Sequence, residues 1–102
     1  MPLFMVKREF FNQYKSRKKS VELRNVQPQW KNSRVGNEAV LKCGRDILRK
    51  RILKIHRGSL DKILKEVDYT RIFPDAQDML EARRMAREVY PEDKEFMAFE
   101  LV

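Results

Sequence analysis

The stretch of sequence that decides the fold is a basic turn followed by an alternating segment, Arg17-Lys18-Lys19-Ser20-Val21-Glu22-Leu23-Arg24. From residue 20 to residue 24 polar and apolar side chains alternate, a period of two that is typical of a half-buried β-strand. Val21 and Leu23 would face a core, and the opposite face would carry a hydroxyl, a carboxylate and a guanidinium. Such a face suits a polar planar ligand or a phosphate, because Arg presents paired donors in fixed geometry while Glu only accepts. The alternative is an ordinary solvated face of a sheet.

The composition predicts one small domain. The 102 residues (1–102) suffice for a single hydrophobic core but not for two. The single cysteine, Cys43, excludes an internal disulfide, and no apolar run approaches the roughly 18 residues that cross a bilayer, so we expect a cytoplasmic protein without a membrane segment. The one histidine, His56, has no cysteine or histidine at ligand spacing. We therefore expect a structural or exposed His56, no metal site and, without a glycine-rich phosphate loop, no cofactor.

Positive charge is concentrated in the first half of the chain. Residues 1–57 contain 16 Lys and Arg against 4 Asp and Glu, whereas residues 58–102 contain 7 against 11. If the first half forms a continuous surface, that surface attracts polyanions such as nucleic acid. The alternative is that the two halves mix in space and neutralise each other.

The periodicity of the sequence predicts strands at both ends and helices between them. We expect an N-terminal strand over residues 3–7 and an aromatic-rich helix over 10–16. After the strand at 20–24, we expect a loop over 25–34 and a further strand over 38–43. Ser59 would cap a short helix, and Pro74 with Asp75 would open a longer one that ends near Tyr90. Residues 96–101 alternate again and predict a terminal strand. The segment 46–57 is ambiguous, because its apolar residues fit a helical period slightly better than a strand.

Three segments together resemble the ASCH domain family, which is related to the PUA-like β-barrels. Residues 17–24 resemble a "GxKTxExR" turn and strand, residues 34–37 a "xVGD" turn, and residues 90–101 a closing "YPxxxxFMAxEL" segment. Their order and spacing carry the resemblance over nearly the whole chain. Arg17 stands where the family usually has glycine, Ser20 where it commonly has threonine, and Asn37 where it has aspartate.

The resemblance implies an α+β fold, a small mixed β-barrel flanked by two to three helices. On that basis Ile47 to His56 would be a long strand, bulged near Arg51 and Ile52 to reconcile its two out-of-phase apolar sets. The terminal strand would pair with an early strand and remove an exposed edge.

The resemblance also implies a ligand. ASCH and PUA-like domains are associated with RNA and with modified bases, which implies an RNA- or nucleotide-binding module with a basic cleft. Its binding residues would be Arg17, Lys18, Lys19, Ser20, Glu22, Arg24 and Trp30. In this interpretation the cations engage a phosphate or a base edge and Trp30 stacks on a base. The alternative for Trp30 is a residue of the core or of the cleft rim.

A catalytic interpretation remains open beside the binding one. Some small bacterial ASCH proteins are amidohydrolases that remove the acetyl group from N-acetylated cytidine, and Lys19 aligns with the lysine that these enzymes use. Glu22, the second catalytic candidate, stands where those enzymes carry threonine. A third possibility is that Lys19, Glu22 and Arg24 form a static salt-bridged network.

Overall fold

The computed structural model describes residues 1–92 and 94–102 and contains five strands and four helices among them. Along the chain the elements come in the order β1 (Leu3–Met5), α1 (Arg8–Lys15), β2 (Val21–Asn25), β3 (Glu38–Cys43), β4 (Asp46–Gly58), α2 (Leu60–Glu66), α3 (Tyr69–Ile72), α4 (Met79–Val89) and β5 (Phe96–Leu101). The predicted α+β class is confirmed. One helix more than expected is present, because the four-residue α3 is too short to have a period. None of the described helices is long and apolar enough to cross a membrane.

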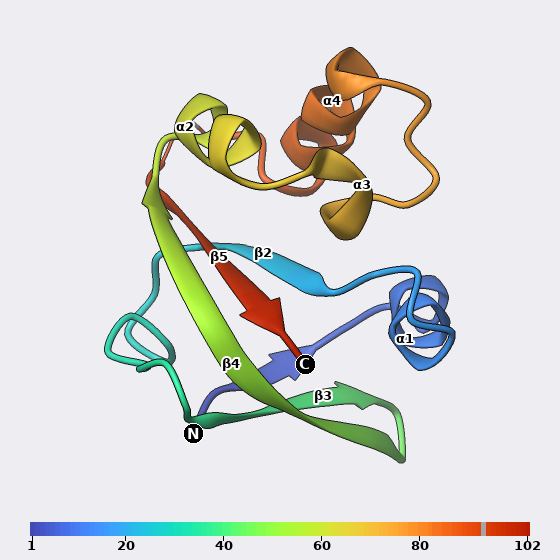
Figure 1. Cartoon of the computed structure of the whole chain (residues 1–102), viewed down its shortest axis with the longest axis vertical. Helices are drawn as coiled ribbons and strands as arrows, with labels where there is room; N and C mark the ends of the chain where they lie inside the picture. Colours follow the sequence, from blue (N-terminus) through green and yellow to red (C-terminus); the bar gives the residue numbers. More distant parts are fainter. Residues whose placement is uncertain (93) are drawn as a thin grey trace.

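The five strands form one curled mixed sheet in the order β1-β3-β4-β5-β2. β1 runs parallel to β3, and the other neighbouring pairs are antiparallel. The sheet is a half-barrel, because its two edge strands, β1 and β2, are not paired with each other. Helix α1 joins these two edges, while α2, α3 and α4 lie together over the other end of the sheet (Figure 1).

Strand β4 resolves the ambiguity of the central segment in favour of a strand. Its first half pairs with β3 and its second half with β5, with a register shift between Ile52 and Lys54. The expected bulge is therefore present, one residue beyond the predicted place. The helical preference of the local pattern was wrong, since pairing on both sides of the strand outweighs a weak periodic signal.

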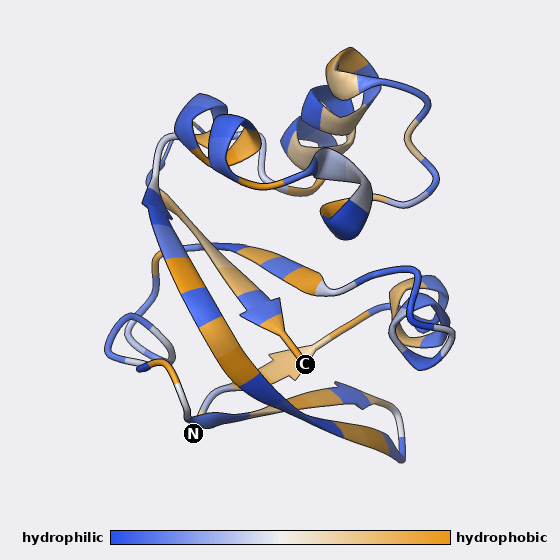
Figure 2. Cartoon of the chain, viewed as in Figure 1, coloured by the Kyte–Doolittle hydropathy of each residue, from blue (hydrophilic) through white to orange (hydrophobic). Residues whose placement is uncertain are grey.

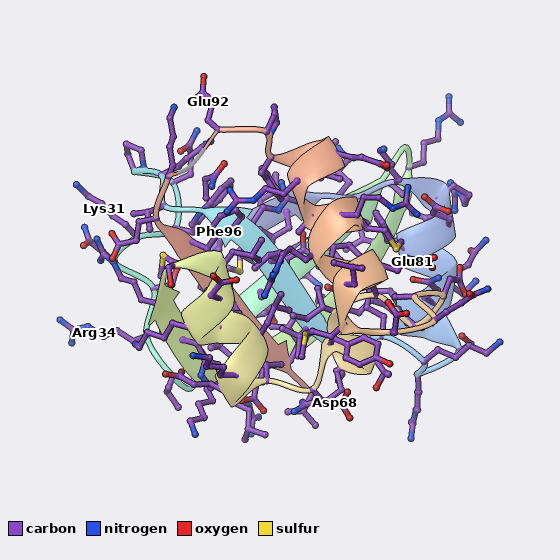
Figure 3. All side chains as sticks on the ribbon, turned by 90° about the horizontal axis from the view of Figure 1, so that it is seen from above. Lys31, Arg34, Asp68, Glu81, Glu92 and Phe96 are labelled. Atoms are coloured by element: carbon purple, nitrogen blue, oxygen red, sulfur yellow. The ribbon has the colours of Figure 1, made fainter. Side chains whose placement is uncertain are left out.

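The core consists of two hydrophobic clusters on opposite faces of the sheet. Along β5, Phe96 and Ala98 pack toward the helices, while Met97 and Phe99 belong to the cluster inside the half-barrel. Figure 3 shows Phe96 beneath the helices, whereas Lys31 and Arg34 extend outward from the loop after β2. Apolar colour accordingly follows most of β5 and is interrupted by a hydrophilic band near its C-terminal end (Figure 2), since a central strand buries both of its faces.

Helices α2, α3 and α4 begin at side-chain caps, whereas α1 does not. Ser59 accepts a hydrogen bond from the backbone N–H of Lys62 and begins α2 as predicted. The longer helix begins later than predicted: Asp78, and not the Pro74–Asp75 pair, accepts from the N–H of Glu81 and caps α4. Both aspartates suited the positive end of the helix by charge, but only the hydrogen bond identifies the cap.

Candidate functional site

A cavity of about 140 Å³ lies at the open seam of the half-barrel, between the edge strands. We call it the seam pocket. Elements from both halves of the chain form it, namely β1 and the start of α1, β2, the end of α3, and the end of α4. Its lining residues are Met5, Val6, Lys7, Phe10, Lys19, Glu22, Leu23, Arg24, Ile72, Phe73, Val89 and Tyr90.

The Lys19 amine is the buried cation of the seam pocket. Only 5% of the residue is exposed, and its Nζ donates to the carbonyl of Val21 at 2.8 Å and to the carbonyl of Ile72 at 2.5 Å. Nζ also lies 5.2 Å from the ring centre of Phe10 and 5.7 Å from that of Phe73. Burial disfavours the charged form and lowers the pKa of Lys19 to about 8, although the Glu22 carboxylate opposes the shift.

Glu22 is a buried carboxylate held by two donors. It accepts from the hydroxyl of Tyr14 at 2.5 Å and from Nε of Arg24 at 2.7 Å, and it is 5% exposed. Burial raises the pKa of Tyr14 well above its ordinary value, and the negative charge of Glu22 raises it further. Tyr14 therefore stays protonated and donates. The alternating face of β2 is consequently a covered polar network and not a solvated sheet face.

Arg24 bridges the seam. Its Nη2 donates to the carbonyl of Met5 at 2.6 Å, while its guanidinium carbon lies 5.2 Å from the ring centre of Phe4 and 5.4 Å from that of Trp30. The guanidinium thus has its edge in hydrogen bonds and its faces near aromatic rings, which is the environment that Arg fills better than Lys.

Trp30 lies behind Arg24, in the core of the half-barrel. The residue is 7% exposed, its ring centre lies 5.3 Å from that of Phe4, and its Nε1 donates to the carbonyl of Asn25 at 2.8 Å. The ring does not reach the seam pocket. The expected stacking of Trp30 on a base is therefore incompatible with this conformation, and the alternative of a core residue describes it.

The remaining predicted residues lie apart from the seam pocket. Ser20 accepts a hydrogen bond from Nε of Arg71 at 2.8 Å, and it lines a second cavity together with Arg17. Arg17 has a positive φ of 65°, and Lys18 is exposed outside both cavities. The structure thus brings Lys19, Glu22 and Arg24 together and places Arg17, Lys18, Ser20 and Trp30 elsewhere.

Sequence reasoning missed the aromatic walls of the pocket and the role of Tyr14. The spacing of Phe10 and Tyr14 indicated only a buried helix face, and Tyr90 only the end of a helix. Tyr90 lines the pocket and donates from its hydroxyl to the carbonyl of Leu23 at 3.0 Å. Burial raises the pKa of Tyr90. A signal was present, since Tyr90 belongs to the segment that resembles the closing motif.

His56 is buried between two carboxylates, which the sequence did not reveal. Its Nδ1 lies 2.8 Å from Glu66 and its Nε2 lies 2.6 Å from Glu100, and Glu100 also accepts from Nη1 of Arg71 at 2.9 Å. Burial alone would raise the pKa of Glu100, but hydrogen bonds from His56 and Arg71 outweigh it and lower the pKa. We call His56, Glu66, Glu100 and Arg71 the histidine array. Arg71 belongs to α3 and also donates to Ser20, so the array holds α3 in place. The last carbonyl of α3, that of Ile72, accepts from Lys19. Among the described residues no cluster of His, Cys, Asp and Glu is arranged to hold a metal ion.

Comparison with known proteins gives a fold and no closer relationship. No protein-family model and no curated protein matches the sequence. Among solved structures, the hypothetical protein PH0355 superposes with a TM-score of 0.78 at 18% identity, covering 99% of this chain and 97% of that one. Protein PF0455 from Pyrococcus furiosus gives 0.71 at 21% identity, covering 98% and 94%. The ASCH protein from Zymomonas mobilis gives 0.71 at 17% identity, and this chain covers 65% of its length. The chain therefore has the fold of an ASCH domain.

Proposed function

We propose that the seam pocket binds the base of an RNA- or nucleotide-derived ligand. The observation that carries the proposal is the meeting of Lys19, Glu22 and Arg24, one donor, one acceptor and one fork-shaped cation, in a single cavity that opens to solvent. Each group is already fixed by a neighbour within the protein. Polar groups held in place in this way recognise a ligand with little loss of side-chain freedom.

The size of the pocket favours a single six-membered ring. Its volume of about 140 Å³ is close to that of a cavity which holds benzene, roughly 150 Å³. Phe10, Phe73 and Tyr90 supply flat apolar walls against which a base can stack. We therefore expect a pyrimidine in preference to a purine.

The polar groups favour cytosine among the pyrimidines. A carboxylate accepts from the exocyclic amino group of cytosine, as Glu22 would, and an ammonium donates to the ring carbonyl, as Lys19 would. Uracil offers a carbonyl in place of that amino group and would face the Glu22 carboxylate acceptor to acceptor. Discrimination by one such contact is about 1–3 kcal/mol.

Calorimetric titration with cytidine, uridine and adenosine tests the proposal. Cytidine should bind more tightly than uridine, and adenosine more weakly than either. Lys19→Met and Glu22→Gln should each weaken cytidine binding by about tenfold or more, because each removes a hydrogen bond to a charged group. Lys54→Met serves as a matched control, since Lys54 is exposed and lies outside the seam pocket. Absence of cytidine binding to the unaltered protein, or equal affinity in all variants, would reject this pocket as the site.

Salt dependence tests the RNA branch of the proposal. If a single-stranded RNA is the ligand, Lys19→Ala and Arg24→Ala should weaken its binding and flatten its dependence on salt. Unchanged affinity and slope in both variants would reject RNA as the occupant of this site while leaving a nucleoside as the ligand.

One observation favours amidohydrolase activity as a second candidate. With a pKa of about 8, roughly a tenth of Lys19 is neutral at pH 7. The neutral amine can donate to the Val21 and Ile72 carbonyls and still hold a lone pair. That lone pair can accept a proton from a water whose oxygen attacks the acyl carbon of N-acetylated cytidine. The carbon–nitrogen bond then breaks, and the amino group of cytidine takes the proton from Lys19.

The catalytic candidate has its own test. Incubation with N-acetylated cytidine should release cytidine at a rate that rises with pH up to about 8, as the Lys19 amine loses its proton. Lys19→Ala should abolish the turnover, and Lys54→Ala should leave it unchanged. If the unaltered protein shows no turnover, catalysis is excluded and the binding proposal stands.

A further inference from the structure

A second cavity of about 260 Å³ adjoins the basic turn before β2. We call it the turn cavity. Its lining residues are Tyr14, Arg17, Lys19, Ser20, Lys50, Leu101 and Val102. Lys19 also lines the seam pocket, so both cavities border this one residue.

The turn cavity is positively charged. Arg17 and Lys50 contribute two cations, no side chain in the described lining is acidic, and the nearby Lys19 directs its buried ammonium to the carbonyls of Val21 and Ile72. Within the described part of the chain, neither Arg17 nor Lys50 has a hydrogen bond or an ion pair with a side chain. By contrast, Arg49 on the same strand is neutralised by Glu38 at 2.6 Å. Two cations without an acidic partner, beside a third that is buried, make a site for an anion.

The hydrogen-bond donors match a phosphate. A guanidinium meets two phosphate oxygens at once, and a lysine acts as a point charge. The Ser20 hydroxyl oxygen already accepts from Arg71, so its own hydrogen remains free to donate. Lys50 also lines an adjoining hollow together with Arg51 and the Arg49–Glu38 ion pair.

We propose that the turn cavity is a phosphate-binding subsite in which Arg17, Lys50 and the Ser20 hydroxyl hold a phosphate group of the ligand whose base occupies the seam pocket. The link to a base rests on the proposed function, whereas the phosphate site itself does not. The subsite would make phosphorylated nucleotides and short oligonucleotides better ligands than free nucleosides.

The backbone conformation at Arg17 allows a substitution that separates the effect of its charge from an effect on stability. Its φ of 65° lies in the left-handed region, which disfavours side chains and suits glycine. Arg17→Gly should therefore remove the cation without lowering stability. If Arg17 had only a structural role, Arg17→Gly would lower the free energy of unfolding and the affinity for phosphate together.

Titration with inorganic pyrophosphate at low salt tests the phosphate site directly. The unaltered protein should bind it, and Arg17→Gly and Lys50→Gln should each weaken binding by about tenfold. Lys54→Gln makes the same charge change on the same strand outside the cavity, and it should have little effect. Guanidinium unfolding should find Arg17→Gly at least as stable as the unaltered protein. Absence of pyrophosphate binding, or an equal loss in Lys54→Gln, would overturn the proposal.

Titration with cytidine and with a cytidylate trinucleotide tests the link between the cavities. The trinucleotide should bind about tenfold more tightly than cytidine, and Arg17→Gly should remove that advantage without changing the affinity for cytidine. If pyrophosphate binds but cytidine does not, the phosphate site stands and the proposed function fails. If cytidine and pyrophosphate both bind and the trinucleotide gains nothing, the two cavities do not share a ligand.

Discussion

The Nη2 of Arg24 lies 2.6 Å from the carbonyl oxygen of Met5 and so ties the last strand of the sheet order to the first. No backbone ladder joins these two edges among the described residues. A side chain therefore does at the seam what backbone pairing does between the other strands. The same guanidinium neutralises the buried Glu22, so one residue supports both the fold and the seam pocket.

Arg24→Met should lower the free energy of unfolding by about 3–5 kcal/mol, because it leaves the Glu22 carboxylate buried without its cation. Guanidinium unfolding measures the loss. Arg8→Ala is the comparison: the Arg8–Asp46 pair is about half exposed on both sides, so solvent screens it and its loss should change stability little. Similar losses in the two variants would contradict the bridging role.

Stability should rise with pH between about 8 and 10. The folded state holds Lys19 with a pKa of about 8, against 10.5 in the unfolded chain, so it binds fewer protons over this range. The cost of burying the charge, roughly 3 kcal/mol, is present below pH 8 and is relieved as the amine deprotonates. Urea unfolding at pH 7.5 to 9.5 should show this slope, and Lys19→Met should abolish it. Tyr14 does not interfere, since burial moves its titration further above pH 10.

Acid should weaken the junction of α2, α3 and β5. The pKa values of Glu66 and Glu100 are lowered in the fold, the first chiefly by a hydrogen bond from His56. The unfolded chain therefore takes up these protons first as pH falls below about 4.5, and the stability contributed at higher pH is lost. Melting temperatures between pH 6 and 3 should fall more steeply for the unaltered protein than for Glu100→Gln. If melting temperature falls equally with pH in both proteins, the contacts of Glu100 with His56 and Arg71 contribute little to stability.

Trp30 is the single tryptophan, so intrinsic fluorescence reports on one site. Because Trp30 is only 7% exposed, we expect blue-shifted emission and weak quenching by acrylamide. Arg24→Met removes the cation near the ring and should shift the emission. Nucleoside binding should not quench Trp30 strongly, because the ring lies outside the seam pocket. Strong quenching on binding would restore the stacking role expected from the sequence.

The ends of the fold were predictable because their signals are local. The alternation at residues 20–24 and 96–101 and the Ser59 cap each depend on neighbouring residues in the chain, and each predicted its element. Strand β4 was not predictable from its own pattern, since it exchanges partners halfway and its apolar set changes phase at the bulge. The start of α4 was misplaced because two aspartates compete for one cap, and only a hydrogen bond distinguishes them.

The candidate site was predictable only where its residues are close in sequence. Lys19, Glu22 and Arg24 share one turn and strand, so their meeting in the pocket follows from local geometry. The partners of His56 lie 10 and 44 residues away, and the loop that carries Trp30 has no period to indicate burial. Arg17 is a different case: it stands where the resembling motif usually has glycine, and the positive φ at this position explains why glycine suits it.

The half-open barrel has a consequence for ligand discovery. Since the walls of the seam pocket come from both sheet edges and from three helices, a compound that fills it holds together parts that must separate when the chain unfolds. Such a compound would raise the melting temperature by mass action, by about 2.7 kcal/mol of added stability at a hundredfold excess over its dissociation constant. A nucleoside library screened by dye-monitored melting would therefore rank occupants of the seam without a chemical assay.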